Sequence, residues 1–521
     1  MVSRTAEGVA AMPFFRAFNW RALGVFFYSF CIALSFLAFA TKSSPLFPFN
    51  DWVDANVHFT VGKGMLHGMV PYRDLFDHKG PLIYFIYGLG AILFPTNFSG
   101  IYLLEVVFLT ASLYFMYCVI RLFSSASLAL VALPLWAAVT LNSASFTHGA
   151  SAEEFSLPFM IFSLLHLVRY LRQPPHLPPS HHHIMINGIA AGCVLLVKFS
   201  LMGFWVGWIV ILLGRIAPQT SWRSPVRMAG AFAGGVAIAT IPWLAYFQLH
   251  GAVYDFLEVY FHLNLTAYAT PASGIERLTM AITSLMTSAK ANPALTSLVV
   301  LGCLGPLIWR GFFHGDHWAR IAMPLLCAGL AVSVYAGGRS NVYYFLAFAP
   351  LAITGLAFCA WCIHGNWAPS HPWVVTLSMT LTASLLWYTT TFNANQGMRK
   401  IPKADLVQYK WAHIINQASD KSLLNFGWLD IGLHTMTDTL PATRFFFKSN
   451  IPDERFPTAR EQQQDYVRQR ATEFVVATTA KGHEDRFPID SLIPEHYILI
   501  ADETQLYENV MLRHLLFQRT K

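Results

Sequence analysis

The sequence predicts a polytopic α-helical membrane protein with a small α/β domain at its C-terminal end. Of the 521 residues, 55% are hydrophobic and only 12% are charged, so polar groups are too few to cover the surface of a soluble domain. Long apolar runs fill residues 1–392. From residue 393 onward the apolar runs shorten to strand length and charges become frequent, which predicts a separate soluble domain over 393–521.

Apolar runs long enough to cross a bilayer, roughly 17–22 residues each, give eleven predicted spans. The N-terminus is expected in the cytoplasm, because Arg4, Arg16 and Arg21 precede the first span and no cleavage site follows it. The spans are expected at about 22–41, 101–120, 126–143, 154–171, 184–199, 201–217, 228–248, 293–309, 319–336, 342–363 and 371–390.

A shorter apolar run at 81–95, broken by two glycines, is predicted to lie at the outer membrane interface rather than to cross. Only then do the basic connections between the spans all fall on the cytoplasmic side. The same count places the first long loop (43–100), the loop 249–292 and the domain 393–521 on the extracytoplasmic, periplasmic side of the cytoplasmic (inner) membrane. A second interfacial helix is expected in loop 249–292.

Short apolar runs in the C-terminal domain predict an alternation of strands and helices. The domain contains no glycine-rich phosphate loop, no GxSxG motif and no metal-ligand spacing. We therefore expect it to support the membrane part or to contact the acceptor rather than to carry the chemistry. Strands are expected at 422–426, 444–447, 473–478 and 497–501, and helices at 430–437 and 459–470.

The first outer loop concentrates charge in a chain that is otherwise poor in it. Between Phe49 and Tyr84 it contains four aspartates, three histidines and three cations. An exposed loop explains this composition equally well. A functional site is favoured over a simple exposed loop, because polar residues at the ends of other spans fall on the same outer face. Ionisable groups at the membrane edge mark functional sites. These residues are His148, Glu153, Glu154, Lys198 and Arg339.

An outer-face pocket built from these residues would suit a reaction on a lipid phosphate. The cations Lys79, Lys198 and Arg339 would bind an anionic head group and stabilise its phosphate as a leaving group. The carboxylate of Asp54 would accept the proton of an incoming hydroxyl. The residues thus predict group transfer from a lipid-linked phosphate, although composition does not name the group.

The spacing within the first loop carries a resemblance to a known family. Asp54 is followed fourteen positions later by Gly68, then by Val-Pro-Tyr-Arg-Asp at 70–74 and Asp-His-Lys-Gly-Pro at 77–81. This loop resembles that of the membrane-embedded GT-C glycosyltransferases, in the branch of the protein O-mannosyltransferases and lipid A aminoarabinose transferases. Further similar stretches are HGASAEEFSLPF (148–159), VKFSLMGFW (197–205) and GRSNVYYF (338–345).

The resemblance implies a polyprenyl-phosphate sugar donor, an inverting single displacement and a site at the outer membrane face. Asp54 matches the catalytic base of the family, and Lys79 and Lys198 match its two phosphate-binding cations. Glu153 or Glu154 takes the place of a second acidic residue. His78 is placed among the substrate-binding residues. The element that closes the pocket is matched by Arg339, Tyr343 and Tyr344, with Tyr343 where a histidine is usual.

Two points in the first loop leave alternatives open. Many family members have two adjacent acids, whereas Asp54 is followed by Ala55, so a divalent metal stays an open question. Asp77 and His78 would be able to hold such an ion, but a hydrogen-bonded role in the loop is favoured. Asp51 is the alternative base, although a helix N-cap explains it more simply.

The leading interpretation is a glycosyltransferase with a polyprenyl-phosphate-linked sugar donor and a lipid, glycan or protein acceptor, surrounded by membrane lipids. The alternative is a transporter or flippase of a lipid-linked sugar without catalysis. A transporter would place ionisable groups near the middle of the bilayer, whereas this chain gathers them in outer loops. A nucleic-acid partner is not expected despite the net charge of +7, because Lys and Arg are scattered between apolar runs.

Overall fold

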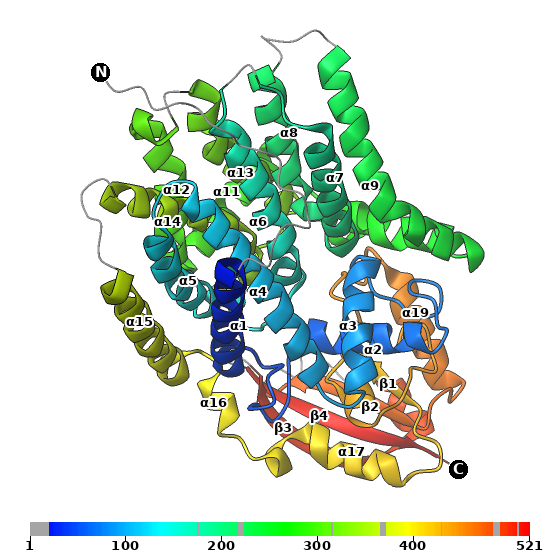
Figure 1. Ribbon diagram of the computed structural model, residues 1–521. Coiled ribbons are helices and arrows are strands. Elements are labelled where there is room, and N and C mark those ends of the chain that lie inside the picture. The colour runs from blue at the N-terminus through cyan, green and yellow to red at the C-terminus, as the bar shows by residue number, and fades with distance from the viewer. Residues whose placement is uncertain are drawn as a thin grey trace, which may run out of the picture.

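A computed structural model describes residues 20–174, 177–216, 223–313, 316–364, 371–428, 430–482, 490–507 and 510–520. A bundle of long helices forms the larger part, and a twisted sheet from the C-terminal part of the chain lies beneath the helices α2 and α3 (Figure 1). Arg4 and Arg16, which entered the prediction of orientation, lie outside the described residues.

Each of the eleven apolar segments predicted to span the membrane forms a helix. These are α1 (Trp20–Ala40), α4 (Ser99–Arg121), α5 (Ala126–Leu141), α6 (Ala152–Leu171), α7 (His181–Val197), α8 (Gly203–Ile216), α9 (Arg223–Leu249), α12 (Pro293–Ile308), α13 (His317–Tyr335), α14 (Ala349–His364) and α15 (His371–Phe392). Among the described residues, seven helices are long and apolar enough to cross a membrane, or eight if one bent pair counts as a span. The chain is therefore a multi-pass membrane protein, and the number of eleven crossings stays a prediction.

The first loop folds into two helices, α2 (Val53–Leu66) and α3 (Pro81–Leu93), which correspond to its charged part and to the predicted interfacial run. Their backbones touch: a Cβ atom on Gly62 would lie 2.3 Å from the carbonyl oxygen of Tyr84. Only glycine permits this approach. α2 is consequently enclosed on nearly all sides, so its polar side chains point into protein rather than into solvent.

The predicted helix in loop 249–292 is α11 (Gly274–Ala291), which meets α12 at a bend of 117°. Its first turn is fixed by a capping box, in which Ser273 N donates to Glu276 Oε2 at 2.7 Å. Between α9 and α11 the chain forms the short helix α10 (Val253–Phe256) and two π-helical turns that end at Tyr268. The position of α3 and α11 at a membrane interface remains a prediction.

The C-terminal part forms a four-stranded sheet in the order β1-β2-β4-β3. β1 and β2 are parallel, whereas β4 is antiparallel to β2 and to β3. The elements are α16 (Gln396–Arg399), α17 (Val407–Gln417), β1 (Leu423–Phe426), α18 (Leu433–Met436), α19 (Pro457–Arg468), β2 (Phe474–Ala480), α20 (Leu492–His496), β3 (Tyr497–Tyr507) and β4 (Val510–Arg519). The predicted small α/β domain is confirmed, although its boundary at residue 393 stays a prediction.

The predicted strand at 444–447 is wrong. Its apolar residues are buried, but its carbonyl groups bond to two different parts of the chain instead of to one neighbouring strand: Arg444 O accepts from Phe76 N at 2.9 Å, and Phe446 O accepts from Asn425 N at 3.0 Å. The segment therefore links the first loop to the sheet. The strand β4 was not predicted, because its apolar residues follow one another instead of alternating with polar ones.

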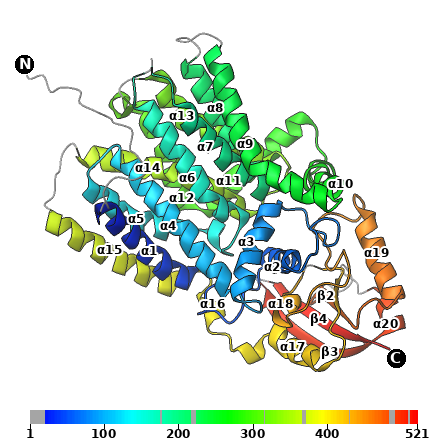
Figure 2. The same ribbon diagram turned by 45° about the vertical axis from the view of Figure 1, so that its right-hand side comes forward.

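Further contacts join the C-terminal domain to α2. Thr60 Oγ1 donates to Asp430 Oδ2 at 3.2 Å, and Lys63 Nζ lies 2.6 Å from Asp438 Oδ1. Figure 2 shows α18 and the sheet directly below α2. These contacts place the C-terminal domain on the same side of the membrane as the first loop.

Candidate active site

Asp54 and Lys79 form an ion pair in the first loop. Asp54 lies in the first turn of α2, and Lys79 lies two residues before α3, with Lys79 Nζ 3.3 Å from Asp54 Oδ2. Burial alone would raise the pKa of Asp54, but Lys79, assisted by His58 and His78, lowers it to about 2. The opposite holds for Lys79: burial would lower its pKa, but Asp54 and Asp77 raise it. Both groups are therefore charged at neutral pH.

The backbone around Lys79 is held from several directions. Tyr72 OH donates to Lys79 O at 2.7 Å, and Lys79 N donates to Tyr84 OH at 2.9 Å. A Cβ atom on Gly80 would lie 2.0 Å from Leu196 O, so glycine is required where the loop passes α7. The backbone of Lys79 is thus held in place by its neighbours, unlike the backbone of a flexible surface loop.

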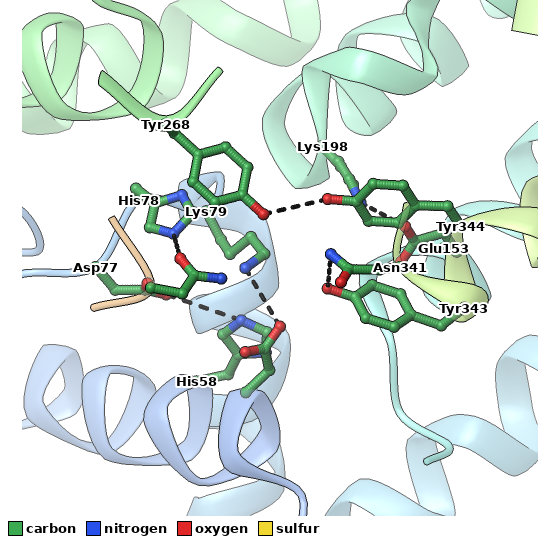
Figure 3. A network of polar contacts seen from close by, with 12 residues as sticks. His58, Asp77, His78, Lys79, Glu153, Lys198, Tyr268, Asn341, Tyr343 and Tyr344 are labelled. Carbon is green, nitrogen blue, oxygen red and sulfur yellow. Dashed lines mark hydrogen bonds and ion pairs between the residues drawn. The ribbon is translucent and has the colours of Figure 1, made fainter. Parts of the chain in front are cut away.

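His58 lies one turn after Asp54 on α2 and is almost completely buried. Burial lowers its pKa to about 4, so its ring is neutral. Neither ring nitrogen has a hydrogen-bond partner among the described residues, and Nε2 lies 3.8 Å from Asp77 Oδ2. Figure 3 shows His58 below Lys79 and facing Asp77. His58 is therefore a buried polar group next to the Asp54–Lys79 pair. It was not predicted from the sequence.

Lys198 and Glu153 form a second ion pair across the site. Lys198 caps the end of α7, Glu153 lies in the first turn of α6, and Lys198 Nζ is 2.5 Å from Glu153 Oε1. The ammonium group of Lys198 lies 3.7 Å from the ring centroid of Tyr344 and 5.5 Å from that of Tyr343. The carboxylate and the two rings fix the direction in which Lys198 points (Figure 3).

Arg339, Tyr268 and Tyr344 close the site from the other side. The guanidinium of Arg339 stacks over the Tyr268 ring at 4.5 Å and donates to Tyr268 O from Nε and Nη2 at 3.1 and 3.0 Å. The hydroxyl groups of Tyr268 and Tyr344 lie 3.3 Å apart, and Figure 3 shows them pointing toward each other. The π-helical turn and the segment after α13 are thereby joined across the site.

These side chains surround a cavity of about 180 Å³. Cationic and aromatic side chains make up half of its wall, and no carboxylate is among the described residues that line it. Such a wall attracts an anion with an apolar portion. The cationic and aromatic members are His78, Lys79, Lys198, Phe199, Tyr260, Tyr268, Arg277, Arg339 and Tyr344.

Most of the predicted site residues therefore lie together. They contact one another or line the same cavity, and they are Asp54, Lys79, Lys198, Arg339 and Glu153. Tyr343, Tyr344 and His78 lie beside them. Glu154 does not take part. Its side chain is buried next to Glu105 on α4, away from Lys198. Of the two acids left open by the sequence, Glu153 is the one beside the cavity.

The remaining aspartates of the loop have structural partners. Asp51 is bound to Lys42 at 2.6 Å, and Asp74 accepts from Val70 N at 2.7 Å. Asp77 Oδ2 accepts from Tyr84 OH at 2.8 Å. Within the described residues no group of three or more His, Cys, Asp or Glu side chains is arranged to hold a metal ion. Asp77 and His78 are engaged in hydrogen bonds to other residues, and the alternative of a divalent ion on them stays open.

Arg277 and Asn264 are among the residues of the cavity region that were not foreseen. Arg277, in the first turn of α11, lines the cavity with its side chain exposed. Asn264 holds the ring of His78 through its amide oxygen, 2.9 Å from Nδ1. The only sequence signal for either was their position in loop 249–292, in which a second interfacial helix was expected.

Two crystal structures of ArnT from Cupriavidus metallidurans have a similar architecture. The structure bound to undecaprenyl phosphate matches with a TM-score of 0.51 at 13% sequence identity, over 95% of this chain and 96% of that chain. The apo structure matches with a TM-score of 0.55 at 11% identity, over 96% and 98%. The chain has the GT-C fold.

Residues 78–246 of this GT-C protein also match the family model described as dolichyl-phosphate-mannose-protein mannosyltransferase. The matched segment begins at His78 and includes Lys79, Glu153 and Lys198. A search of curated protein sequences gives no match. The structural matches confirm the predicted fold, and the family model confirms the predicted class of enzyme, a glycosyltransferase.

Proposed function

We propose that this GT-C protein transfers a sugar from a polyprenyl phosphate to a hydroxyl acceptor, with the reaction at the outer face of the cytoplasmic membrane. The observation that carries the proposal is the Asp54–Lys79 pair at the edge of the cation-lined cavity. A carboxylate and a cation 3.3 Å apart supply the two functions that glycosyl transfer needs, a base for the nucleophile and a charge for the leaving phosphate.

The cavity supports a phosphate-linked donor. Lys79, Lys198, Arg277 and Arg339 point their charges toward it or line it, and three tyrosine rings supply apolar surface. The similar ArnT chain was crystallised with undecaprenyl phosphate. We infer that the donor of this chain is likewise a polyprenyl phosphate, whose sugar lies next to Asp54.

The proposed step is a single displacement with inversion. The oxygen of the acceptor hydroxyl attacks the anomeric carbon, and the bond from that carbon to the phosphate oxygen breaks with its electron pair. Asp54 accepts the hydroxyl proton, and the cations stabilise the released phosphate. When the phosphate draws Lys79 away, Asp54 loses the charge that keeps its pKa near 2. Its basicity then rises at the moment when a proton must be taken.

The membrane part, 1–392, would carry this chemistry, and the domain 393–521 would lie with the site on the extracytoplasmic side. A lipid, glycan or protein acceptor fits the residues equally well. No comparable observation supports the transporter alternative. A transporter takes no proton from an acceptor, so a carboxylate beside the donor phosphate would only repel that phosphate.

The test is a reaction with purified protein in lipid nanodiscs. A panel of polyprenyl-phosphate sugars is added with candidate acceptors, and the release of polyprenyl phosphate is measured. We expect release from one donor class that depends on acceptor. Binding of the same donor without any release, together with its movement across proteoliposome membranes, would identify a transporter instead.

A further inference from the structure

A second and much smaller space lies on the other side of the His78–Lys79 pair. Its volume is about 10 Å³, which is about the space that a single water molecule or hydroxyl oxygen requires. Among the described residues, only His78 and Lys79 line both this space and the large cavity. The wall of the small space consists of Asp54, Val57, Asp77, His78, Lys79, Phe447, Ser449 and Asn450.

Three of these wall residues come from the C-terminal domain, in the segment 447–450. The segment is held firmly: Lys448 N donates to Trp428 O at 2.8 Å, and Lys448 Nζ pairs with Asp453 Oδ2 at 2.8 Å. The neighbouring Phe445 packs against Phe76 of the first loop, with ring centroids 4.8 Å apart. The domain therefore presents a fixed wall to Asp54.

Asn450 is bound to the ring of His78. Its Oδ1 lies 3.1 Å from His78 Nε2, while Asn264 Oδ1 lies 2.9 Å from Nδ1. A neutral imidazole has one donor and one acceptor, so it cannot serve two amide oxygens. Burial, together with the charge of Lys79, lowers the pKa of His78 and keeps the ring neutral.

The orientation of Asn264 decides which nitrogen of His78 donates. Asn264 Nδ2 donates to His78 O at 2.7 Å and to Tyr260 O at 2.9 Å, so its Oδ1 must face the ring and accept from Nδ1. Nε2 is then the acceptor, and the amide of Asn450 must be turned over so that its nitrogen donates there. In this orientation the side-chain oxygen of Asn450 has no side-chain partner among the described residues.

We propose that the small space beside Asp54 receives the acceptor hydroxyl, and that Asn450 of the C-terminal domain accepts a hydrogen bond from the acceptor. The ligand class is a hydroxyl-bearing acceptor, which enters between the domain and the first loop while the donor occupies the large cavity on the other side of Lys79. The side chain of Asn450 is exposed and so can be reached from outside. This inference rests on the proposed glycosyl transfer and adds to it the place of the acceptor.

The experiment uses the full chain in nanodiscs and compares N450A with N416A. Asn416 is an exposed residue on α17 that lines neither space, so its substitution is a matched control. In N450A we expect the KM for the acceptor to rise about tenfold, in line with the loss of a hydrogen bond, while the affinity for polyprenyl phosphate stays within twofold. Water would enter the enlarged space, so donor hydrolysis should increase relative to transfer.

A second variant tests the same site by filling it. In N450Q the added methylene would occupy the small space, and we expect the rate of transfer to fall while the thermal unfolding midpoint and donor affinity are retained. The inference would be overturned if the acceptor KM and the ratio of hydrolysis to transfer both stayed at wild-type values in the two variants. If D54N retained full transfer, only the assignment of Asp54 as the base would fail. The proposed function itself would fail if the wild type released no polyprenyl phosphate from any donor in the presence of acceptor, which is a different outcome.

Discussion

The two acid–lysine pairs of the site are alike in composition but differ in geometry. Asp54 and Glu153 each lie in the first turn of a helix, and each binds a lysine from the segment next to another helix. The Asp54–Lys79 contact is 3.3 Å long and the carboxylate side chain is 21% exposed, whereas the Glu153–Lys198 contact is 2.5 Å long and the carboxylate is 1% exposed. We therefore expect the first pair to separate when a substrate binds and the second to hold its cation in place.

The largest difference between the pairs should appear when each carboxylate is made neutral. In D54N we expect the rate of transfer to fall about 1,000-fold or more, because the general base is lost. In E153Q, which retains a hydrogen-bond acceptor for Lys198, we expect a loss of about tenfold. Rates of polyprenyl phosphate release measure both. Equal losses in the two variants would show that the pairs do not differ in role.

Removal of the lysines should give the next largest effect. In K79M we expect donor affinity to fall about 10- to 150-fold, since a charged contact to phosphate is worth roughly 1.5–3 kcal/mol. Titration with fluorescent polyprenyl phosphate measures this affinity. K198M, which removes the second cation, is the matched comparison and should weaken binding less, because Glu153 holds the charge of Lys198 more closely than Asp54 holds that of Lys79. A larger effect in K198M would reverse the assignment.

The pH dependence of K79M separates the two roles of Lys79. The lysine keeps the pKa of Asp54 near 2, so in the wild type Asp54 is ionised at any pH well above that value. Without the lysine, burial raises this pKa, and Asp54 becomes protonated at a higher pH. We expect the acid limb of the residual activity to move to higher pH in K79M and not in K198M. An unmoved acid limb in K79M would mean that another group controls it.

The smallest effect is expected from Arg277, which lines the cavity from an exposed position. In R277A we expect donor affinity to fall by about three- to tenfold, and the loss should shrink at high salt because exposed charges are screened. The affinity of R227A, a substitution on the distant N-terminal half of α9, serves as the control. A loss that does not depend on salt would indicate a direct and buried contact instead.

The sequence predicted the helices of the membrane part and the grouping of the candidate site residues on one face, for an identifiable physical reason. Apolar runs of bilayer length report helices directly, and the rule that basic loops stay inside placed Asp54, Glu153, Lys198 and Arg339 on one face before any contact was known. The structure brings these residues together. Which of Glu153 and Glu154 faces Lys198 depends on the rotation of α6, which no periodicity revealed.

The parts that were missed depend on contacts between distant segments. Asn450 meets His78 across 372 positions of the chain, and nothing near Asn450 in the sequence marks it. The segment 444–447 looked like a strand because it is apolar, but its carbonyl groups bond to the first loop and to β1. β4 looked unlike a strand because it is covered on both faces and so lacks alternation.

The most direct test of the role of Asp54 is a single turnover with donor already bound. Labelled polyprenyl-phosphate sugar is loaded onto wild-type and D54N protein in nanodiscs, binding is verified, acceptor is added, and released polyprenyl phosphate is counted. We expect the wild type to release its bound donor after acceptor is added, and D54N to hold the donor with similar affinity but not to release it. Release from D54N at the wild-type rate would contradict the assignment of Asp54 as the base.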